Sequence, residues 1–379
     1  MTYDVAVIGA GVFGSWTARQ LRRSGASVLL IDAYGPGNSR ASSGGESRII
    51  RLGYGPDELY SRSAQHSFNL WQQLFDKTGN LFRKTGMLWL ARERDPYCEA
   101  TLATLQRINA NHERLDHDEL ERRFPQLNIG PTTWGILEPD SGILLARRAV
   151  QAVVAQAQAE GVEYLEAAIT SPTAGGRVNS IPTTSGNEII AERFVFACGP
   201  WLPKIFPELL GELIHVTRQE VYFFGVPSGD RSFNQGVLPT WIDFNDLVYG
   251  LPNVDGRGFK IAIDAHGPAF DPDTGERVVT PAGLNAVREY VKQRLPRLAN
   301  APVIETRVCQ YENTSTGDFL IDRHPGFENV WLVGGGSGHG FKHGPVVGEY
   351  AARIVLGGAH TEPRFSLASK QRVQDRKVY

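Results

Sequence analysis

Cysteine is scarce in this chain of 379 residues, and one of its three cysteines lies in an unusual context. Cys309 occurs in RVCQYENTSTGDFLIDRHP (307–325), between charged residues and a tyrosine, where the surrounding pattern is that of a strand and a turn. A free cysteine is commonly a small buried hydrophobe, so a structural thiol and a functional thiol both fit this position. Cys98 and Cys198 have no comparable context, and we interpret them as structural.

Two arginines, Arg48 and Arg51, follow a loop rich in glycine and serine, GPGNSRASSGGES (35–47). Their spacing in ESRIIR predicts that they lie on roughly one side of a helical turn, with two isoleucines between them. The ordinary interpretation of this pattern is the start of a surface helix that carries two solvated arginines.

Two lysines occur in patterned stretches further along the chain. In FKIAID (259–264) polar and apolar residues alternate, so Lys260 and Asp264 are expected on one face of a strand. Taken alone, this stretch fits a half-exposed strand with a Lys–Asp surface pair. Lys342 lies in a glycine-rich segment, and by itself it fits an ordinary solvated lysine.

A glycine turn with the spacing G-x-G-x-x-G, GAGVFG (9–14), follows a predicted strand at 3–8 and opens a predicted helix. Gly9, Gly11 and Gly14 let the backbone approach a pyrophosphate, which the helix N-terminus stabilises. Asp32 ends the second strand, where its carboxylate can accept from an adenosine ribose hydroxyl. This acid favours FAD or NAD over NADP. The position near the N-terminus and the absence of a second such turn favour FAD, and the alternative is a glycine turn with no ligand.

A second glycine-rich segment, GGGSGHGFKHGP (334–345), contains two histidines four residues apart, His339 and His343. Glycines and Pro345 prevent a helix there, and no carboxylate or cysteine lies nearby, so we predict no metal site. The segment instead offers flexible backbone and the positive end of a helix, which would stabilise an anionic reduced flavin.

Strand, glycine turn and helix recur at both ends of the chain, which predicts an α/β (α+β) fold. We expect a discontinuous Rossmann-like FAD-binding domain with an inserted antiparallel-sheet substrate domain. The expected helices lie near residues 57–77, 116–124, 147–160, 280–295 and 345–356. The FAD-binding domain is expected at 1–80, 145–210 and 305–379, and the substrate-binding domain at 81–144 and 211–304.

Composition excludes several other classes of protein. A formal net charge of −2 with no basic block predicts no nucleic-acid partner. No apolar run approaches the roughly 18 residues that a membrane span needs. Three cysteines make an odd count, which argues against a disulfide framework. The strand pattern begins at the N-terminus, so we expect a soluble cytoplasmic protein that is a monomer.

Several motifs occur in order along nearly the whole chain: GAGVFG, SRIIRLGYG, EPDSGILLARRAV, VFACGPW, VYGLP, GFK, VCQYENTSTGDFLIDRHP and SGHGFKHGPVVGEY. Together they resemble the covalent-flavin amine oxidases typified by monomeric sarcosine oxidase and N-methyltryptophan oxidase, within the D-amino-acid-oxidase-like superfamily. Collinear motifs of this length are far more specific than any one of them. The resemblance implies oxidation of a secondary, N-substituted amino acid to an imine, with O2 reduced to H2O2.

The resemblance also implies roles for matched residues. Cys309 would carry FAD through an 8α-thioether, and Arg48 would lie close to the flavin ring. Arg51 and Lys342 would bind the substrate carboxylate, and Lys260 would activate oxygen on the other flavin face. The remaining expected residues are Tyr249 and Tyr311 around the substrate, and Ser43, Gly338, His339 and Gly340 against the cofactor.

Two positions depart from the family pattern. Gly44 and Asp264 stand where sarcosine oxidase carries histidines, four residues before the first arginine and four residues after the oxygen-activating lysine. Asp264 places a negative charge in the substrate cavity or a salt bridge near Lys260, which puts sarcosine itself in doubt as the preferred substrate. The alternatives are a flavin dehydrogenase that passes electrons to a partner, a nicotinamide dehydrogenase, and a non-catalytic or RNA-modifying flavoprotein.

Overall fold

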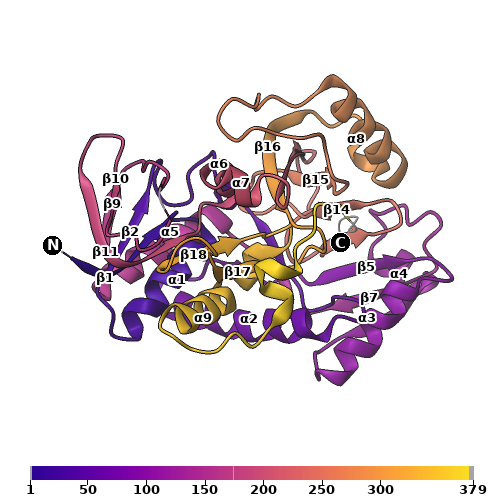
Figure 1. Cartoon of the computed structure of the whole chain (residues 1–379). Coiled ribbons are helices and arrows are strands. Elements are labelled where there is room, and N and C mark those ends of the chain that lie inside the picture. The colour runs from indigo at the N-terminus through magenta and orange to yellow at the C-terminus, as the bar shows by residue number, and fades with distance from the viewer. Residues whose placement is uncertain (1, 174, 375–379) are drawn as a thin grey trace.

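The computed structural model describes residues 2–173 and 175–374, and three β-sheets organise this part of the chain (Figure 1). The first sheet has seven strands and a mainly parallel core. Its strands follow the order β17 (Leu320–Arg323), β18 (Val330–Gly334), β11 (Glu188–Phe196), β1 (Tyr3–Ile8), β2 (Val28–Asp32) and β9 (Glu163–Glu166), with β10 (Ser180–Pro182) paired to β11.

The central strand β1 is buried on both faces, as expected of a parallel strand covered on both sides. Val5 and Val7 belong to a core cluster formed with the covering helices, and Ala6 and Ile8 belong to the cluster on the opposite face. The helices packed on the first face are α1 (Val12–Arg23), α2 (Glu58–Thr78), α5 (Ala146–Ala159) and α9 (Gly344–Val355). In Figure 1, α1, α9 and α2 lie together below the sheet.

The second sheet has eight strands and is antiparallel except where β13 pairs with β5. Its strands follow the order β16 (Val303–Asn313), β12 (His215–Phe224), β15 (Phe259–Ile263), β14 (Val248–Leu251), β13 (Thr240–Asp243), β5 (Met87–Ala91), β7 (Trp134–Glu138) and β6 (Glu113–Asp116). The helices associated with it are α3 (Pro96–Arg107), α4 (His117–Arg123) and α8 (Pro281–Arg294). Figure 1 shows α8 and α3 at opposite edges of this half of the molecule.

The third sheet is small and joins the two larger parts. It consists of β3 (Arg48–Ile50), β8 (Gly142–Leu144) and β4 (Phe82–Arg83). The remaining elements are short: α6 (Leu202–Ile205), α7 (Pro207–Leu210), η1 (Ser42–Gly44), η2 (Gly199–Trp201), η3 (Pro296–Leu298), η4 (Gly340–His343), η5 (Pro363–Phe365) and η6 (Leu367–Ser369).

The two large sheets agree with the expected mixed α/β architecture, and the five expected helices form within about one residue of their predicted bounds. Thr280 caps α8, as its hydroxyl accepts from Gly283 N at 3.1 Å. The strand that carries Cys309 pairs with β12 along its length, so Cys309 belongs to the eight-stranded sheet. The proposed boundary at residue 305 therefore falls inside β16, and residues 1, 174 and 375–379 of the proposed domains lie outside the described residues.

One local prediction is wrong. Arg48 does not begin a helical turn, because Arg48–Ile50 forms the strand β3, which pairs with β8 in register Arg48 to Leu144. Two β-branched isoleucines favour this extended conformation. The partner strand lies about a hundred residues away in the sequence, where no local pattern could indicate it.

Candidate functional site

The turn between β1 and α1 forms one wall of a large cavity, and its glycines are required by close backbone contacts. Gly9 has a φ of +107°, and a Cβ there would lie 2.3 Å from the carbonyl oxygen of Ala197. A Cβ on Gly14 would lie 1.9 Å from the carbonyl oxygen of Gly9. Gly11 has no side chain that could cap α1. The N-terminus of this helix, where backbone N–H groups have no partner within the helix, lines the cavity.

Two polar side chains hold the rim of this turn. Asp32, at the end of β2, accepts from Ala10 N at 2.7 Å and from Tyr34 N at 2.9 Å. Burial raises the pKa of this carboxyl above its ordinary value, although these backbone N–H groups oppose the shift. Ser43 Oγ accepts from Val12 N at 3.0 Å, so the serine-rich loop is joined to the first turn of α1.

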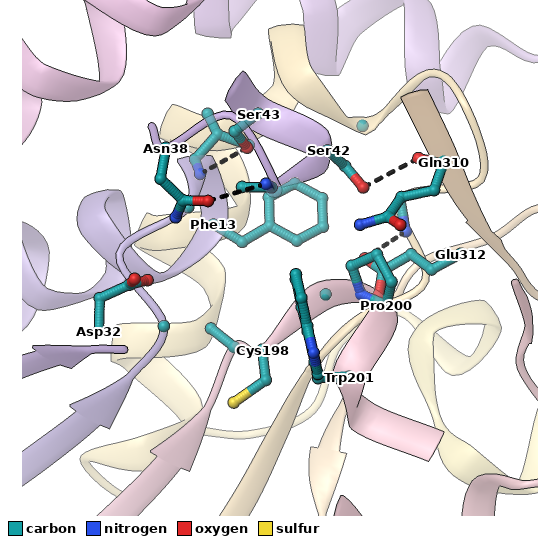
Figure 2. Close-up of a pocket in the computed structure, with 18 of the residues that line it drawn as sticks. Phe13, Asp32, Asn38, Ser42, Ser43, Cys198, Pro200, Trp201, Gln310 and Glu312 are labelled. Carbon is teal, nitrogen blue, oxygen red and sulfur yellow. Dashed lines mark hydrogen bonds between the residues drawn. The ribbon is translucent and has the colours of Figure 1, made fainter. Parts of the chain in front are cut away.

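The cavity itself has a volume of about 290 Å³ and is open along one side. Its walls come from the ends of β1 and β2, the start of α1, the loop at residues 38–43, the segment after β11, β16 and the glycine-rich turn after β18. Figure 2 shows Asp32 on one side and Glu312 on the other, with the ring of Phe13 between them. A positive helix end, an acid at the end of the second strand and glycines that leave room for a backbone-contacting ligand fit a dinucleotide such as FAD.

A second, smaller cavity of about 80 Å³ adjoins the first. The two cavities share five lining residues: Arg48, Cys309, Tyr311, Gly338 and Phe341. Buried cations dominate the second cavity, since Arg51, Lys260 and Lys342 line it together with Arg48. The structure thus brings four cations from three distant segments to one small space beside the dinucleotide cavity.

Cys309 lies where the two cavities meet. Its Sγ accepts from Arg48 Nη2 at 3.3 Å, and Arg48 also donates to Ser42 O at 2.6 Å. The serine-rich loop is held against β16 on the same side, because Ser42 Oγ donates to Gln310 O at 2.9 Å. The thiol is half-buried and borders both cavities, unlike Cys98, which is fully buried in the core.

Arg51 and Lys342 both contact Tyr54. The guanidinium carbon of Arg51 is 4.4 Å from the centre of the Tyr54 ring, and its Nη1 donates to Gly53 O. Lys342 Nζ donates to Tyr54 Oη at 2.8 Å and to His339 O at 3.1 Å. Lys342 is 4% exposed, so the interpretation as a solvated lysine is wrong. The buried network explains the difference, because sequence alone could not indicate its partners.

Lys260 is also buried, and the interpretation as a half-exposed surface strand is wrong. All residues of β15 except Ile263 are buried, and Lys260 is 5% exposed. Its Nζ donates to Ser47 O at 3.1 Å and Ser47 Oγ at 3.3 Å. Burial, followed by the nearby Arg48 charge, lowers the pKa of Lys260 to about 7.

Two tyrosines and one carboxylate complete the second cavity. Tyr311 Oη donates to Asp264 Oδ1 at 2.8 Å, which holds Asp264 in the cavity wall. The Tyr249 ring centre is 5.9 Å from Lys260 Nζ. Burial, then Asp264, raises the pKa of both tyrosines above the ordinary value, so both phenols stay neutral. Among the described residues that line this cavity, Asp264 is the single carboxylate.

The glycine-rich segment after β18 divides between the two cavities. Gly338 has a φ of +77°, and a Cβ there would lie 2.8 Å from the Tyr311 ring. Gly340 lines the dinucleotide cavity, where a Cβ would lie 2.8 Å from Phe13. His339 lines the second cavity, and its ring contacts Tyr54 Oη at 3.2 Å and Gly317 O at 3.0 Å.

The two histidines share a tyrosine partner. His343 Nε2 lies 2.8 Å from Tyr54 Oη, and its Nδ1 lies 2.9 Å from Ser63 Oγ. Burial, followed by the Lys342 and Arg51 charges, lowers the pKa of His343 well below its usual value. Within residues 2–173 and 175–374, no group of three or more potential metal ligands occurs.

Two residues that organise Arg51 and Lys342 were not among the predicted site residues. Tyr54 lies in SRIIRLGYG and contacts Lys342, His339 and His343 through one hydroxyl. Glu138 accepts from Leu52 N at 2.7 Å, Gly53 N at 3.1 Å and Trp89 Nε1 at 2.8 Å, which fixes the loop after Arg51. Both residues lie within the quoted motifs, so the motifs themselves were the available signal.

Comparison with known proteins identifies relatives over nearly the whole chain. Residues 4–354 match the family described as FAD dependent oxidoreductase. Monomeric sarcosine oxidase of Streptomyces avermitilis is 32% identical, covering 96% of each chain. N-methyl-L-tryptophan oxidase of Salmonella heidelberg is 27% identical, covering 94% of this chain and 95% of the other. The amino acid oxidase NikD has the same fold, with a TM-score of 0.80, 22% identity, and coverage of 96% and 97%.

Proposed function

We propose a function for this chain from the premise that it belongs to the FAD dependent oxidoreductase family, among the sarcosine oxidases and N-methyltryptophan oxidases. It is an FAD-dependent enzyme that oxidises the C–N bond of a secondary, N-substituted amino acid. The product is an imine, and O2 takes up the two electrons and two protons removed from the substrate to give H2O2. Water then hydrolyses the imine to a carbonyl compound and an amine.

The observation that carries this proposal is the junction of the two cavities at Cys309. A cavity suited to a dinucleotide opens, through five shared lining residues, onto a small cavity lined by four cations, three of them buried. A volume of about 80 Å³ suits a small molecule, and the positive charge suits an anionic one. An amino acid with a free carboxylate satisfies both conditions.

Arg51 and Lys342 are proposed to bind the substrate carboxylate. Both side chains are at least 95% buried, line the small cavity and contact Tyr54. A planar guanidinium can bind a carboxylate through two hydrogen bonds, and an ammonium adds a point charge. Fixing the carboxylate at this end would orient the substrate C–H bond toward the dinucleotide cavity.

Asp264 and Tyr311 are proposed to face the substrate amine. An amine or ammonium N–H needs an acceptor, and Asp264 supplies a carboxylate in a cavity that is also lined by four cations. Its position is fixed by the 2.8 Å hydrogen bond from Tyr311. A cationic cavity end for the carboxylate and an anionic group for the amine favour a zwitterionic amino acid over a simple amine.

FAD, when bound, supplies the two-electron acceptor for the amine and passes the electrons to O2. Lys260 is proposed to stabilise negative charge that develops on oxygen, because its ammonium is buried beside the cavity junction. Arg48 supplies a second fixed positive charge at the junction, next to Cys309. Tyr249 is proposed to border the reacting atoms as a neutral hydroxyl.

Cys309 is proposed to attach FAD covalently through its sulfur. The thiol borders both cavities, and Arg48 Nη2 lies 3.3 Å from Sγ. The new bond from Sγ to the 8α carbon of the flavin would replace the S–H bond and one C–H bond of the 8α-methyl group, and O2 would take up the two electrons and two protons released. The rest of the cofactor is proposed to bind a further set of residues: Gly9, Gly11, Gly14, Asp32, Ser43, Gly338, His339 and Gly340.

The direct test is a panel of amino acids assayed for oxygen consumption and H2O2. The panel contains sarcosine, larger N-methyl amino acids, N-substituted diacids, cyclic imino acids and glycated amino acids. Equimolar O2 loss and H2O2 formation with at least one member is expected. Turnover with an artificial electron acceptor but no O2 consumption would favour the alternative, a flavin dehydrogenase that passes electrons to a partner protein.

We further propose that the enzyme is a cytoplasmic monomer. All three cysteines are free, which suits a reducing compartment. In the described part of the chain, no helix has both the length and the apolar character to cross a bilayer. Light scattering tests the mass, and a value of about twice 41.7 kDa would contradict the monomer.

A further inference from the structure

One buried carboxyl group in the dinucleotide cavity has no role in the mechanism above. Glu312 lies near the end of β16, lines the cavity and is 7% exposed. Its Oε1 accepts from Gly336 N at 3.2 Å. Its Oε2 is buried and has no hydrogen-bond partner among the described residues. An unpaired buried oxygen of this kind costs free energy unless a proton or a ligand satisfies it.

The groups around Glu312 supply no positive charge. Two glycines lie near Oε2, because a Cβ on Gly334, at the end of β18, would lie 3.3 Å from it and a Cβ on Gly199, in η2, would lie 3.8 Å from it. On β12 its paired residue is Val216, which is uncharged. The titratable neighbour before η2 is Cys198, whose thiol pKa is raised by burial, then by Asp32 and Glu312.

Burial raises the pKa of Glu312 to about 7, and the backbone N–H groups of Gly336 and Gly335 offset only part of that shift. Near neutral pH the side chain is therefore divided between two forms with opposite properties. The neutral acid can donate one hydrogen bond from its hydroxyl. The carboxylate can only accept, and it would add a negative charge to a cavity suited to a negatively charged pyrophosphate.

We infer that Glu312 binds FAD as a neutral acid, whose hydroxyl donates a hydrogen bond to an acceptor oxygen of the dinucleotide. Asp32 on the opposite side of the cavity accepts from the cofactor, so the two acids have complementary roles. The inference rests on FAD as the cofactor and is independent of the substrate and of the covalent bond. Because ionised Glu312 repels the pyrophosphate, the affinity for FAD falls as pH rises.

The test uses full-length Cys309→Ser, in which FAD binding is expected to be reversible. The dissociation constant of FAD is measured by quenching of flavin fluorescence between pH 6.0 and pH 8.5. If only the neutral acid binds well, the dissociation constant rises about 30-fold over this range. Cys309→Ser/Glu312→Gln keeps a donor without a titrating group, so its dissociation constant should change little with pH and match the parent at pH 6.0.

Proton uptake provides a second measurement that needs no substitution at Glu312. In weakly buffered solution at pH 8, binding of FAD to Cys309→Ser should take up a fraction approaching one proton per FAD. Absence of uptake, or the same pH dependence in the parent and the glutamine variant, overturns the inference. Failure of the protein to bind FAD at any pH would instead contradict the assignment of the cofactor itself.

Discussion

At the scale of single residues, Cys309 makes the sharpest prediction. Its sulfur borders both cavities and accepts from Arg48, whereas the thiol of Cys98 is fully buried among apolar side chains. Acid precipitation of the wild type should leave the yellow flavin in the pellet, and Cys309→Ser should release it into the supernatant. Cys98→Ala serves as the control and should retain the flavin. Extractable flavin in the wild type would contradict the covalent bond.

Lys260 gives a prediction about pH. Because its pKa is lowered to about 7, the ammonium is present below this pH and is lost as pH rises through it. The rate at which O2 reoxidises the reduced enzyme should therefore fall as pH rises from 6 to 8. Lys260→Met should lower this rate by about 100-fold or more at pH 6 and abolish the pH dependence. Stopped-flow absorbance measures both effects.

Ser47→Ala is the control for Lys260. It removes a hydroxyl that accepts from the ammonium but leaves the charge and the backbone acceptor in place. We expect the pH dependence of reoxidation to remain in this variant. Anaerobic reduction by substrate should be nearly unchanged in Lys260→Met, and equal loss of both half-reactions would assign Lys260 a different role.

Lys342 should affect the binding of carboxylates selectively. Lys342→Met keeps the length of the side chain and removes the charge, so KM for amino acids should rise by about 10- to 100-fold. The KM for a matched amine without a carboxylate should change little. Lys370→Met is the control, because Lys370 is equally buried but donates to Arg364 O away from both cavities. Similar KM changes for both substrates would contradict carboxylate binding.

At the scale of elements, one buried carboxylate accepts two hydrogen bonds from the backbone of the loop after β3. Glu138, at the end of β7, is 1% exposed and accepts from the backbone of Leu52 and Gly53. Glu138→Ala leaves these buried N–H groups unpaired, so it should lower the free energy of unfolding by roughly 2–5 kcal/mol. It should also raise KM, because the same loop follows Arg51. Urea unfolding and steady-state kinetics measure the two effects.

The control for this prediction is an exposed glutamate. Glu58 begins α2 and pairs with Arg62 and Arg107 at the surface, where ion pairs contribute little to stability. Glu58→Ala should change neither the urea midpoint nor KM appreciably. Equal effects in the two variants would show that the loss reflects a general sensitivity of the fold to removal of a carboxylate.

The elements also show which features local sequence could predict. The strand, glycine turn and Asp32 were predictable because they lie within one short β-α-β unit. Arg48 was assigned to the wrong element because β3 exists through pairing with β8, far along the chain. The burial of Lys260 and Lys342 depends on Ser47 and Tyr54, which reach them from distant segments. The resemblance supplied their roles, but not these contacts.

Gly44, which stands where the family pattern has a histidine, is explained by a close backbone contact within its own loop. A Cβ at this position would lie 1.8 Å from the carbonyl oxygen of Asn38, so the loop in this conformation accepts only glycine. Its φ is ordinary, and no local signal distinguishes it from other glycines of the loop. At Asp264, the hydrogen bond from Tyr311 crosses between β16 and the end of β15, which the alternation of FKIAID could not indicate.

At the scale of the whole molecule, the dinucleotide cavity is formed by both large sheets. Asp32 comes from the seven-stranded sheet, Gln310 comes from the eight-stranded sheet, and Ser42 joins them through its hydrogen bond to Gln310 O. FAD bound here would contact both parts and would bind the unfolded chain poorly. Ligand that binds only the folded state stabilises it by an amount set by its concentration relative to the dissociation constant.

Cys309→Ser should therefore show a stability that depends on added FAD. At 100 times the dissociation constant, FAD should raise the free energy of unfolding by about 2.7 kcal/mol, shifting the urea midpoint upward in a single transition. A single transition is expected because the loop at residues 35–47 and the sheet formed by β3, β8 and β4 connect the two parts. If FAD shifted only one of two separate transitions, the cofactor would be held by one sheet alone, and the shared cavity would not form in solution.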